Sequence, residues 1–322
     1  MYKILITGGA GFIGSNLCDH FISEGAQVVV LDNFSTGFRH NIEHHFGNPH
    51  FSLIEGDIRD FETCRKACTG IDYVLHHAAL GSVPRSINDP ITSNGVNVGG
   101  FLNILVAARD AKVKRVVYAA SSSTYGDSET LPKVEDVIGK PLSPYAVTKY
   151  VNELYADVFS KIYGVESIGL RYFNVFGKRQ NPEGAYAAVI PKFVIQLINH
   201  ESPVINGTGD YSRDFTYIGN VIQMNEKAML AENPQAVNTI YNTAVGDQTT
   251  LNTLVEYLKE NLAEFDPEIK NIEIVHGPAR SGDIPHSLAS IDKAKKLLNY
   301  QPSHGIKAGL KESVEWYWEN LR

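Results

Sequence analysis

Tyr145 and Lys149 stand four residues apart and follow a run of three serines at 121–123. The spacing puts both side chains on one face of a helix, which we predict over residues 143–163. A phenol titrates near ~10, so Tyr145 can act as a general base at neutral pH only where a cation such as Lys149 stabilises its phenolate. A serine hydroxyl would then position an alcohol for oxidation. These residues predict proton abstraction from a hydroxyl, although a core tyrosine beside a solvated lysine would give the same spacing.

A glycine-rich turn follows the first apolar run, residues 3–7. Gly8, Gly11 and Gly14 allow a tight turn, close approach of the backbone to a pyrophosphate, and tight packing of the next helix on the strand. That helix, expected to begin near Phe12, directs unpaired N–H groups and a favourable dipole at the phosphates. The turn predicts a dinucleotide site, while a purely structural turn could contain the same glycines.

Asp32 follows the second apolar run, residues 27–31. A carboxylate at this strand end can accept hydrogen bonds from both hydroxyls of an adenosine ribose and would repel a 2′-phosphate. The position therefore favours NAD over NADP as the cofactor. An oxidised nicotinamide would add its positive charge to that of Lys149 beside Tyr145.

The order of elements that must hold these groups predicts a fold of the α/β class. Apolar runs of strand length alternate with amphipathic segments of helix length through the first half, as in a parallel sheet. The expected strands are residues 3–7, 27–31, 51–54, 72–75 and 114–120. Helices over residues 91–110 and 143–163 would cover the sheet. We predict a Rossmann-type parallel sheet with helices on both faces, in an NAD-binding domain of residues 1–175.

Shorter elements separated by Pro, Gly and Asn follow residue 175 and predict a smaller C-terminal substrate lobe over residues 176–322. Its boundary is approximate, because we expect the chain to cross between the lobes. The expected elements are helices near 187–199, 219–231, 250–262 and 306–320, and a strand at 203–206.

Composition narrows the range of partners. The chain carries 29 Lys and Arg against 36 Asp and Glu, a formal net charge of -7 that offers no basic field to a nucleic acid. Cys18, Cys64 and Cys68 are too few for a disulfide framework and lack a second ligand pair for zinc, so we expect reduced core thiols. The sequence opens on the first strand without a leader or a long apolar run, and we expect a cytoplasmic protein without a membrane partner.

The Gly-x-x-Gly-x-x-Gly spacing and the segment His76-His77-Ala78-Ala79 resemble the short-chain dehydrogenase/reductase superfamily. The resemblance implies further cofactor contacts spread over the first half of the chain. These are Phe12, Ile13, Asn33, Ser35, Thr36, Gly37, Asp57, Ile58, Ala78, Ala79, Asn97 and Tyr172, beside Tyr145 and Lys149 themselves.

Four motifs together resemble the nucleotide-sugar epimerase/dehydratase branch of the extended short-chain enzymes. They are the Tyr145 and Lys149 pair and the segments 171–177, 212–215 and 280–283. The resemblance implies that Asn174 contacts the sugar diphosphate, that Arg213 and Arg280 hold the diphosphate, and that Asp283 binds the uridine ribose. Guanidinium groups suit phosphate oxygens and a carboxylate suits ribose hydroxyls.

The residues before Tyr125 and Gly126 select among the reactions of this branch. Dehydratases resemble one another in an Asp-Glu pair there, and decarboxylases in a glutamate, whereas this chain has Ser122 and Ser123. Without those carboxyl groups, the remaining set fits oxidation and reduction at one carbon, as in C4 epimerisation. Ser121 is the expected catalytic hydroxyl, although a shift of one residue would give that role to Ser122 or Ser123.

The nearest resemblance is to bacterial epimerases that act on UDP-N-acetylhexosamines, or their uronates, in polysaccharide assembly. Small and hydroxyl side chains that could line a roomy sugar pocket are Gly81, Ser82, Ser122, Ser123, Gln180, Ala188 and Ser287. Ser287 stands where epimerases restricted to unacetylated hexoses resemble one another in carrying a tyrosine. The alternatives are a UDP-glucose/UDP-galactose 4-epimerase, a net NAD-dependent oxidoreductase, or an idle NAD-binding protein. By analogy with the family we expect a homodimer formed through the helices 91–110 and 143–163.

Overall fold

The computed structural model describes residues 1–182, 188–279 and 285–322. Its centre is a seven-stranded sheet in the order β11-β6-β5-β4-β1-β2-β3, in which every neighbouring pair is parallel. The strands are β1 Lys3–Thr7, β2 Gln27–Asp32, β3 Phe51–Glu55, β4 Tyr73–His76, β5 Arg115–Ser121, β6 Ser167–Tyr172 and β11 Thr239–Thr243. The predicted Rossmann-type fold is confirmed.

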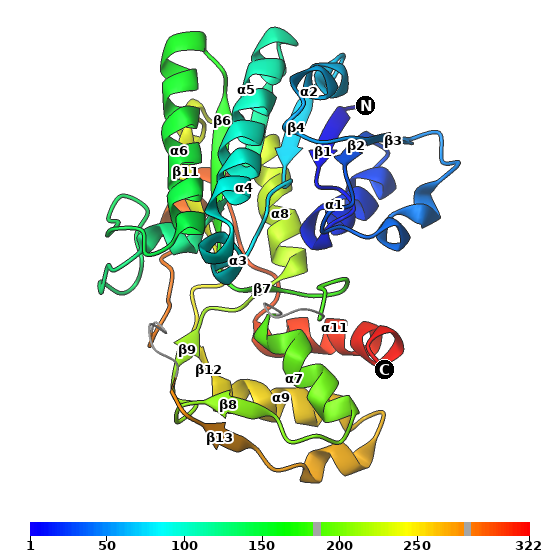
Figure 1. Cartoon of the computed structure of the whole chain (residues 1–322), viewed down its shortest axis with the longest axis vertical. Coiled ribbons are helices and arrows are strands. Elements are labelled where there is room, and N and C mark those ends of the chain that lie inside the picture. Colours follow the sequence, from blue (N-terminus) through cyan, green and yellow to red (C-terminus); the bar gives the residue numbers. More distant parts are fainter. Residues whose placement is uncertain (183–187, 280–284) are drawn as a thin grey trace.

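Helices cover both faces of this sheet (Figure 1). One face packs against α1 Phe12–Ser23 and α8 Ile218–Met229, with α10 Asp292–Leu298 near β11. The other packs against α2 Phe61–Cys68, α5 Phe101–Asp110 and α6 Pro144–Tyr163. Alternation along β1 explains the two cores, because Ile4 and Ile6 face α1 whereas Leu5 faces α5.

The expected helix over 91–110 is a continuous helical segment with an internal change of winding. It comprises α4 Pro90–Asn94, a π-helical stretch Gly95–Gly100, and α5. The short helix α3 Val83–Asn88 precedes it. The segment Pro90–Asp110 is long and apolar enough to cross a membrane by length and composition. Its buried side chains Phe101, Ile104 and Leu105 pack instead against the sheet, as in a core helix.

The lower half in Figure 1 has its own core around three helices, α7 Val189–Ile198, α9 Leu251–Leu262 and α11 Ile306–Asn320. Three pairs of short strands flank them. They are β7 Val175–Phe176 with β10 Thr216–Tyr217, β9 Ser212–Arg213 with β12 Thr249–Thr250, and β8 Val204–Asn206 with β13 Val275–Gly277. Single 3-10 turns occur at 39–41, 43–45, 122–125, 234–236 and 267–271.

The chain returns to the sheet after building part of the lower half. β11 pairs with β6 at the sheet edge, and α8 and α10 pack on the sheet although all three follow residue 175. The division into an NAD-binding part, residues 1–175, and a substrate-binding part, residues 176–322, therefore stays a prediction. The predicted bounds of the other elements agree with the structure to within about two residues, which is the usual uncertainty of helix ends.

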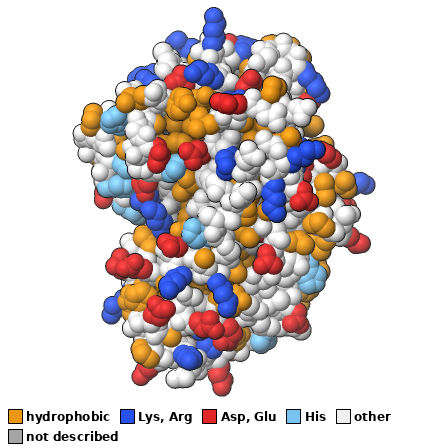
Figure 2. Space-filling model, turned by 180° about the vertical axis from the view of Figure 1, so that it is seen from behind, with side chains coloured by type: hydrophobic (Ala, Val, Ile, Leu, Met, Phe, Trp, Pro, Cys, Tyr) orange, Lys and Arg blue, Asp and Glu red, His pale blue; other side chains and the backbone are white. Residues whose placement is uncertain are grey.

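Charged side chains of both signs are interspersed over the face seen in Figure 2. Cys18, Cys64 and Cys68 are buried and free, as predicted, and burial raises the pKa of the Cys64 and Cys68 thiols to about 12.

Candidate functional site

A cavity of 460 Å³ lies at the carboxyl ends of β1, β2, β4 and β5. Open parallel sheets bind their ligands at this edge. Most of the predicted cofactor and catalytic residues line it, together with the predicted substrate residues Gly81 and Asn174. They are Gly8, Gly11, Phe12, Ile13, Gly14, Asp32, Asn33, Ser35, Thr36, Gly37, Asp57, Ile58, Ala78, Ala79, Gly81, Ser121, Tyr145, Lys149, Tyr172 and Asn174.

The glycine turn between β1 and α1 leaves no room for side chains. A Cβ on Gly14 would lie 2.2 Å from the carbonyl oxygen of Gly8, and Gly8 itself has a φ of +71°. The helix α1 begins after Gly11 without a side-chain cap. Its first N–H groups are therefore available to an anion, which fits the pyrophosphate of a dinucleotide.

Asp32, at the end of β2, is buried beside this turn. Its Oδ2 accepts a hydrogen bond from the Ala10 N–H at 2.9 Å, and its Oδ1 accepts one from Phe34 at 2.8 Å. Burial raises the pKa of the carboxyl group, and these hydrogen bonds oppose the rise. Each carboxylate oxygen keeps a second lone pair, so the group can still accept ribose hydroxyls.

Asp57 and Asn33 form the adjacent rim of the cavity. The Asn33 Nδ2 donates to Asp57 Oδ2 at 2.9 Å, and Arg59 pairs with the same oxygen at 2.7 Å. The hydrogen bonds from Arg59 are the main reason that the pKa of Asp57 falls to about 2. Asp57 is therefore ionised at neutral pH, and Arg59 is a lining residue that the sequence motifs did not identify.

Tyr145 and Lys149 lie one turn apart in α6, as their spacing predicts. Ser143 caps this helix by accepting the Ala146 N–H, and the Ser86 hydroxyl accepts the Tyr145 N–H at 2.9 Å. The Lys149 ammonium lies 5.9 Å from the centre of the Tyr145 ring. The lysine charge therefore lies near the face of the tyrosine ring.

Burial dominates the electrostatics of this pair. It lowers the pKa of Lys149 to about 8. The Lys149 Nζ donates to the Ala119 carbonyl oxygen at 2.8 Å, which fixes its direction. Burial also raises the pKa of Tyr145, and a hydrogen bond with Ser121 partly offsets the rise. The phenol is thus protonated at neutral pH unless a further positive charge enters the cavity.

Ser121 is the last residue of β5, and its side chain hydrogen bonds with that of Tyr145. Its Oγ accepts hydrogen bonds from the Ser123 backbone N–H at 3.2 Å and from the Ser123 hydroxyl at 2.9 Å. Ser121 lines the cavity, whereas Ser122 and Ser123 begin the following 3-10 turn. Of the three serines, Ser121 is the one that hydrogen bonds with Tyr145, and its role as the catalytic hydroxyl stays a prediction.

A second cavity of 290 Å³ shares Asn174 and Val175 with the first. The predicted substrate residues Asn174, Gln180, Ala188 and Arg213 line it. Asn174 has a φ of +35° and its Nδ2 donates to the Asp214 carbonyl oxygen at 3.0 Å. The Arg213 guanidinium is steadied by the carbonyl oxygens of Ser212 and Pro285, at 2.9 and 3.1 Å.

This second cavity also has lining residues that sequence motifs missed. Lys192 adds a cation, Asn206 an amide, and Phe193 an aromatic ring. Lys192 lies on α7, four residues after the predicted residue Ala188, which is the N-cap of that helix. This spacing is a sequence signal for Lys192. Asn206 reaches the cavity through the separate strand β8, and no spacing relates it to the predicted residues.

Other predicted residues that the structure describes lie outside both cavity linings. Asn97 holds the backbone of Leu80 through its Oδ1 at 2.7 Å and its Nδ2 at 3.1 Å, so it supports the cavity wall. Ser82 caps α3 by accepting the Arg85 N–H. Ser287 is half-buried, and its N–H donates to the Ser212 carbonyl oxygen at 3.0 Å. The predicted residues Arg280 and Asp283 lie outside the described residues.

His77 is a further lining residue of the first cavity without an assigned role. Its Nε2 hydrogen bonds with Asn225 at 3.2 Å, and the Asn225 Nδ2 donates to the Tyr172 hydroxyl at 2.9 Å. Burial lowers the pKa of His77 to about 3, so the imidazole is neutral at physiological pH. The pattern His76-His77 signalled the turn but not this link to α8.

Residues 4–244 match the model of the NAD dependent epimerase/dehydratase family. The chain belongs to this family, and its cofactor is NAD. The glycine turn, the carboxylate of Asp32 and the cavity between them fit that cofactor.

Known proteins similar to this chain include nucleotide-sugar 4-epimerases. A putative UDP-glucose 4-epimerase of Methanocaldococcus jannaschii is 35% identical, with 99% of each chain covered. The solved UDP-N-acetylglucosamine 4-epimerase of Methanobrevibacter ruminantium, in complex with UDP-N-acetylmuramic acid, has a TM-score of 0.91 and 36% identity, over 99% of this chain and 98% of that one. The UDP-glucose 4-epimerase of Thermotoga maritima, with UDP-glucose, has a TM-score of 0.90 and 34% identity, over 99% and 100%.

Proposed function

We propose that this protein is an NAD-dependent 4-epimerase of UDP-N-acetylhexosamines. The observation that carries the proposal is the convergence of Ser121, Tyr145 and Lys149 at the cavity that the glycine turn borders. Ser122 and Ser123 stand where a dehydratase would need an acid and a base, so the site is equipped for oxidation and reduction at one carbon. The similarity to several UDP-sugar 4-epimerases supports the same reaction.

In this proposal Tyr145 removes the proton from the C4 hydroxyl of the sugar, and Ser121 hydrogen bonds to the same oxygen. Lys149 lowers the free energy of the phenolate, because its ammonium lies 5.9 Å from the ring. When bound, NAD would supply the hydride acceptor and donor for C4 of the sugar. Tyr145 then gives its proton back, so the enzyme ends each cycle in its starting protonation state.

The second cavity supplies a binding site for the nucleotide. Arg213 and Lys192 are cations suited to the diphosphate, and Asn174 lies at the junction with the first cavity. The sugar would then sit between Asn174 and Tyr145. Epimerisation requires the diphosphate to be held firmly while the sugar turns over, and this separation of binding groups from reacting groups meets that requirement.

Ser287 supports the choice of an acetylated sugar. Its backbone N–H donates to the carbonyl oxygen of Ser212, the neighbour of the lining residue Arg213, and a tyrosine at position 287 would take up more space than a serine. Ser122 and Ser123 add small side chains directly after Ser121. The second candidate is a UDP-glucose 4-epimerase, which the similarity to the Methanocaldococcus and Thermotoga proteins favours.

We also propose that the enzyme is a homodimer. Large apolar side chains are exposed along α3, α4 and α6: Ile87, Ile91, Val147, Leu154, Val158 and Ile162. A second copy of the same helices would cover them in a four-helix contact. Analytical ultracentrifugation tests this directly, and a monomer at micromolar concentration would contradict it.

The function is tested by incubating the purified protein separately with UDP-glucose, UDP-N-acetylglucosamine and its uronate, without added NAD. Proton NMR identifies the products. We expect conversion of UDP-N-acetylglucosamine to its C4 epimer, and slower conversion of UDP-glucose. Preference for UDP-glucose would support the second candidate, whereas release of a keto sugar with NADH would identify a net oxidoreductase. Bound NAD without any turnover would contradict an enzymatic role.

A further inference from the structure

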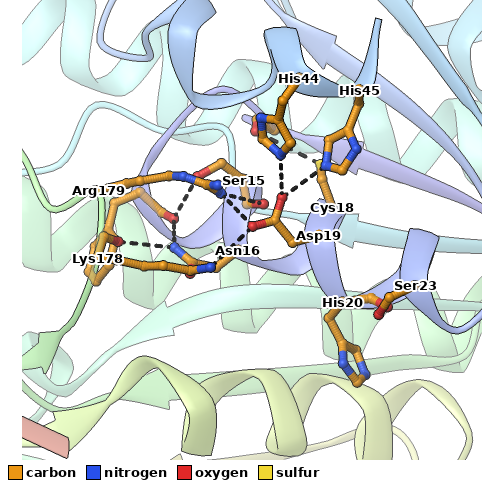
Figure 3. Close-up of polar contacts among 12 residues, drawn as sticks. Ser15, Asn16, Cys18, Asp19, His20, Ser23, His44, His45, Lys178 and Arg179 are labelled. Carbon is orange, nitrogen blue, oxygen red and sulfur yellow. Dashed lines mark hydrogen bonds and ion pairs between the residues drawn. The ribbon is translucent and has the colours of Figure 1, made fainter. Parts of the chain in front are cut away.

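Asp19 on α1 lies where three segments meet, away from both cavity linings (Figure 3). Its Oδ1 accepts hydrogen bonds from Nε2 of His44 at 2.9 Å and from Nε2 of His45 at 2.8 Å. Its Oδ2 contacts Arg179 at 2.8 Å and Lys178 at 3.3 Å. Two imidazole nitrogens and one carboxylate oxygen therefore converge on the side of Asp19 that faces away from the two cations.

We propose that Asp19, His44 and His45 bind a divalent transition-metal ion of the zinc, cobalt or nickel type. Their three ligand atoms lie within 4.8 Å of one another. Imidazole and carboxylate donors suit such ions, whereas magnesium and calcium require oxygen ligands. The His44 side chain is 45% exposed, so water can reach the ion and complete its coordination.

Metal binding requires the side chains to move. Ligand distances of about 2.0 to 2.2 Å put the donors of a tetrahedral ion about 3.4 Å apart. The two nitrogen-to-oxygen distances are 2.9 and 2.8 Å, so the side chains must separate by about half an ångström. His44 stands at the surface of a short 3-10 turn with its ring 4.0 Å from that of His45, and it can move outward.

Two cations hold the other oxygen of the Asp19 carboxylate. Arg179 and Lys178 fix Oδ2 and repel a cation from that side, so an ion must bind at Oδ1. Their positive charge also disfavours magnesium and calcium, which bind mainly through electrostatic attraction to oxygen ligands.

An ion in this position would link α1 to the segment of residues 33–45, whose first residues line the cofactor cavity. Within that segment, the Phe38 N–H and the Asn41 side chain both donate to the Ala10 carbonyl oxygen, at 3.0 and 2.9 Å. Figure 2 shows histidine side chains gathered at the left edge of the upper half, the edge that this segment forms. Metal binding would therefore stabilise the segment and slow the release of NAD.

The test is a titration of the untagged holoenzyme with Co²⁺, followed by visible absorption and by thermal unfolding. We expect one Co²⁺ per chain with ligand-field bands, displacement by Zn²⁺, and a higher Tm with metal. His44→Asn changes an exposed ligand and Asp19→Asn a charged one, and each should weaken binding by at least about tenfold. His40→Asn is the matched control, because it removes an exposed histidine of the same segment.

Binding of Co²⁺ that is equal in His44→Asn and His40→Asn would overturn the proposal, as would the absence of any saturable binding. Binding of Mg²⁺ as strong as that of Co²⁺ would contradict the assigned ligand set. If Asp19→Asn does not fold, the comparison of His44→Asn with His40→Asn still decides the question.

Discussion

The cavity at the glycine turn and the second cavity are lined by different kinds of structure. The first lies across the ends of parallel strands and is bordered by backbone that a single added carbon would displace, as at Gly14 and Gly8. The second is lined by α7 and by strands of two or three residues, with side chains such as Lys192 reaching in from a helix face. The proposed reacting groups therefore lie on β5 and on the helix α6 that packs against the sheet, whereas the proposed binding preference depends on side chains of the lower half.

The largest effect is expected where the backbone itself forms the site. Gly14→Ala puts a Cβ 2.2 Å from the Gly8 carbonyl oxygen, so the turn must open and the cofactor should be lost. We expect turnover below detection and at least about a tenfold drop in NAD that copurifies, since overpacking costs about 1 to 3 kcal/mol or more. Absorbance of the denatured protein's supernatant measures the NAD. Gly99→Ala, where an added carbon meets nothing within 4 Å, is the matched control. Full NAD content in Gly14→Ala would show that the turn is less constrained than the contacts indicate.

Tyr145→Phe removes the proposed base and leaves the cavity intact. Loss of a general acid–base group typically costs about 10² to 10⁴ in rate, and we expect a fall in kcat within that range. NAD content and Tm should stay close to those of the wild type. Tyr150→Phe is the control, because Tyr150 lies on the same helix but lines a different cavity. Near-normal turnover in Tyr145→Phe would exclude it as the base.

Ser287→Tyr tests the claim that preference can change without loss of chemistry. The bulky ring should exclude UDP-N-acetylglucosamine by steric overlap, by about 1 to 3 kcal/mol or more, while UDP-glucose retains activity. The ratio of kcat/KM for the two substrates is the measurement. Ser290→Tyr, a change of the same kind three residues further on, is the control. An unchanged ratio in a folded Ser287→Tyr variant would remove Ser287 from the account of specificity.

A smaller effect is expected on how the free energy of unfolding depends on pH, because buried groups beside the two cavities titrate in opposite directions. The pKa of His77 in the folded chain is about 3, below the value near 6.5 of an unfolded histidine. As pH falls below about 6.5, the unfolded chain binds a proton there that the folded chain does not, so stability is lost by about 1.4 kcal/mol per pH unit. His77→Gln should make the slope of the unfolding free energy shallower by that amount, and His40→Gln is the control. An unchanged slope would contradict the burial of an uncharged His77.

Asp214, next to the second cavity, should act in the opposite direction. Burial raises its pKa to about 6, so the folded chain keeps a proton that the unfolded chain releases near pH ~3.9. This group contributes stability that falls as pH rises from about 4 to about 6. Asp214→Asn removes this titration, so the slope of the unfolding free energy against pH should become more positive by up to about 1.4 kcal/mol per pH unit between about pH 4 and 6. An unchanged slope in urea unfolding of this variant would contradict the raised pKa of Asp214.

The difference between the two cavities also explains how much of the site could be predicted from the sequence. Gly8, Gly14 and Asp32 belong to a local pattern with one structural solution, so their positions were predictable. The spacing of Tyr145 and Lys149 likewise fixed a common helix face. Residues such as Lys192 and Asn206 come together through separate short elements, and no spacing in the sequence relates them.

Two features of the fold show where sequence reasoning ends. β11 carries the mixed sequence Thr239–Thr243, and its partner β6 lies about seventy residues earlier, so the pairing depends on tertiary contacts that a local pattern does not encode. Asn97 matched a family position for a cofactor contact, yet its amide groups are used by the backbone of Leu80. A buried side-chain amide hydrogen bonds to nearby backbone N–H and C=O groups, and only the structure can identify which residues those groups belong to.

The most direct test of the account follows the hydrogen on C4 of the sugar. UDP-N-acetylglucosamine with deuterium at C4 is converted by the holoenzyme in ordinary water without added NAD, and the product is examined by NMR and mass spectrometry. Because the same hydrogen leaves and returns within one closed site, we expect UDP-N-acetylgalactosamine that retains the deuterium at C4. Loss of the deuterium to solvent, or its appearance in released NADH, would contradict epimerisation by a transient oxidation at this carbon.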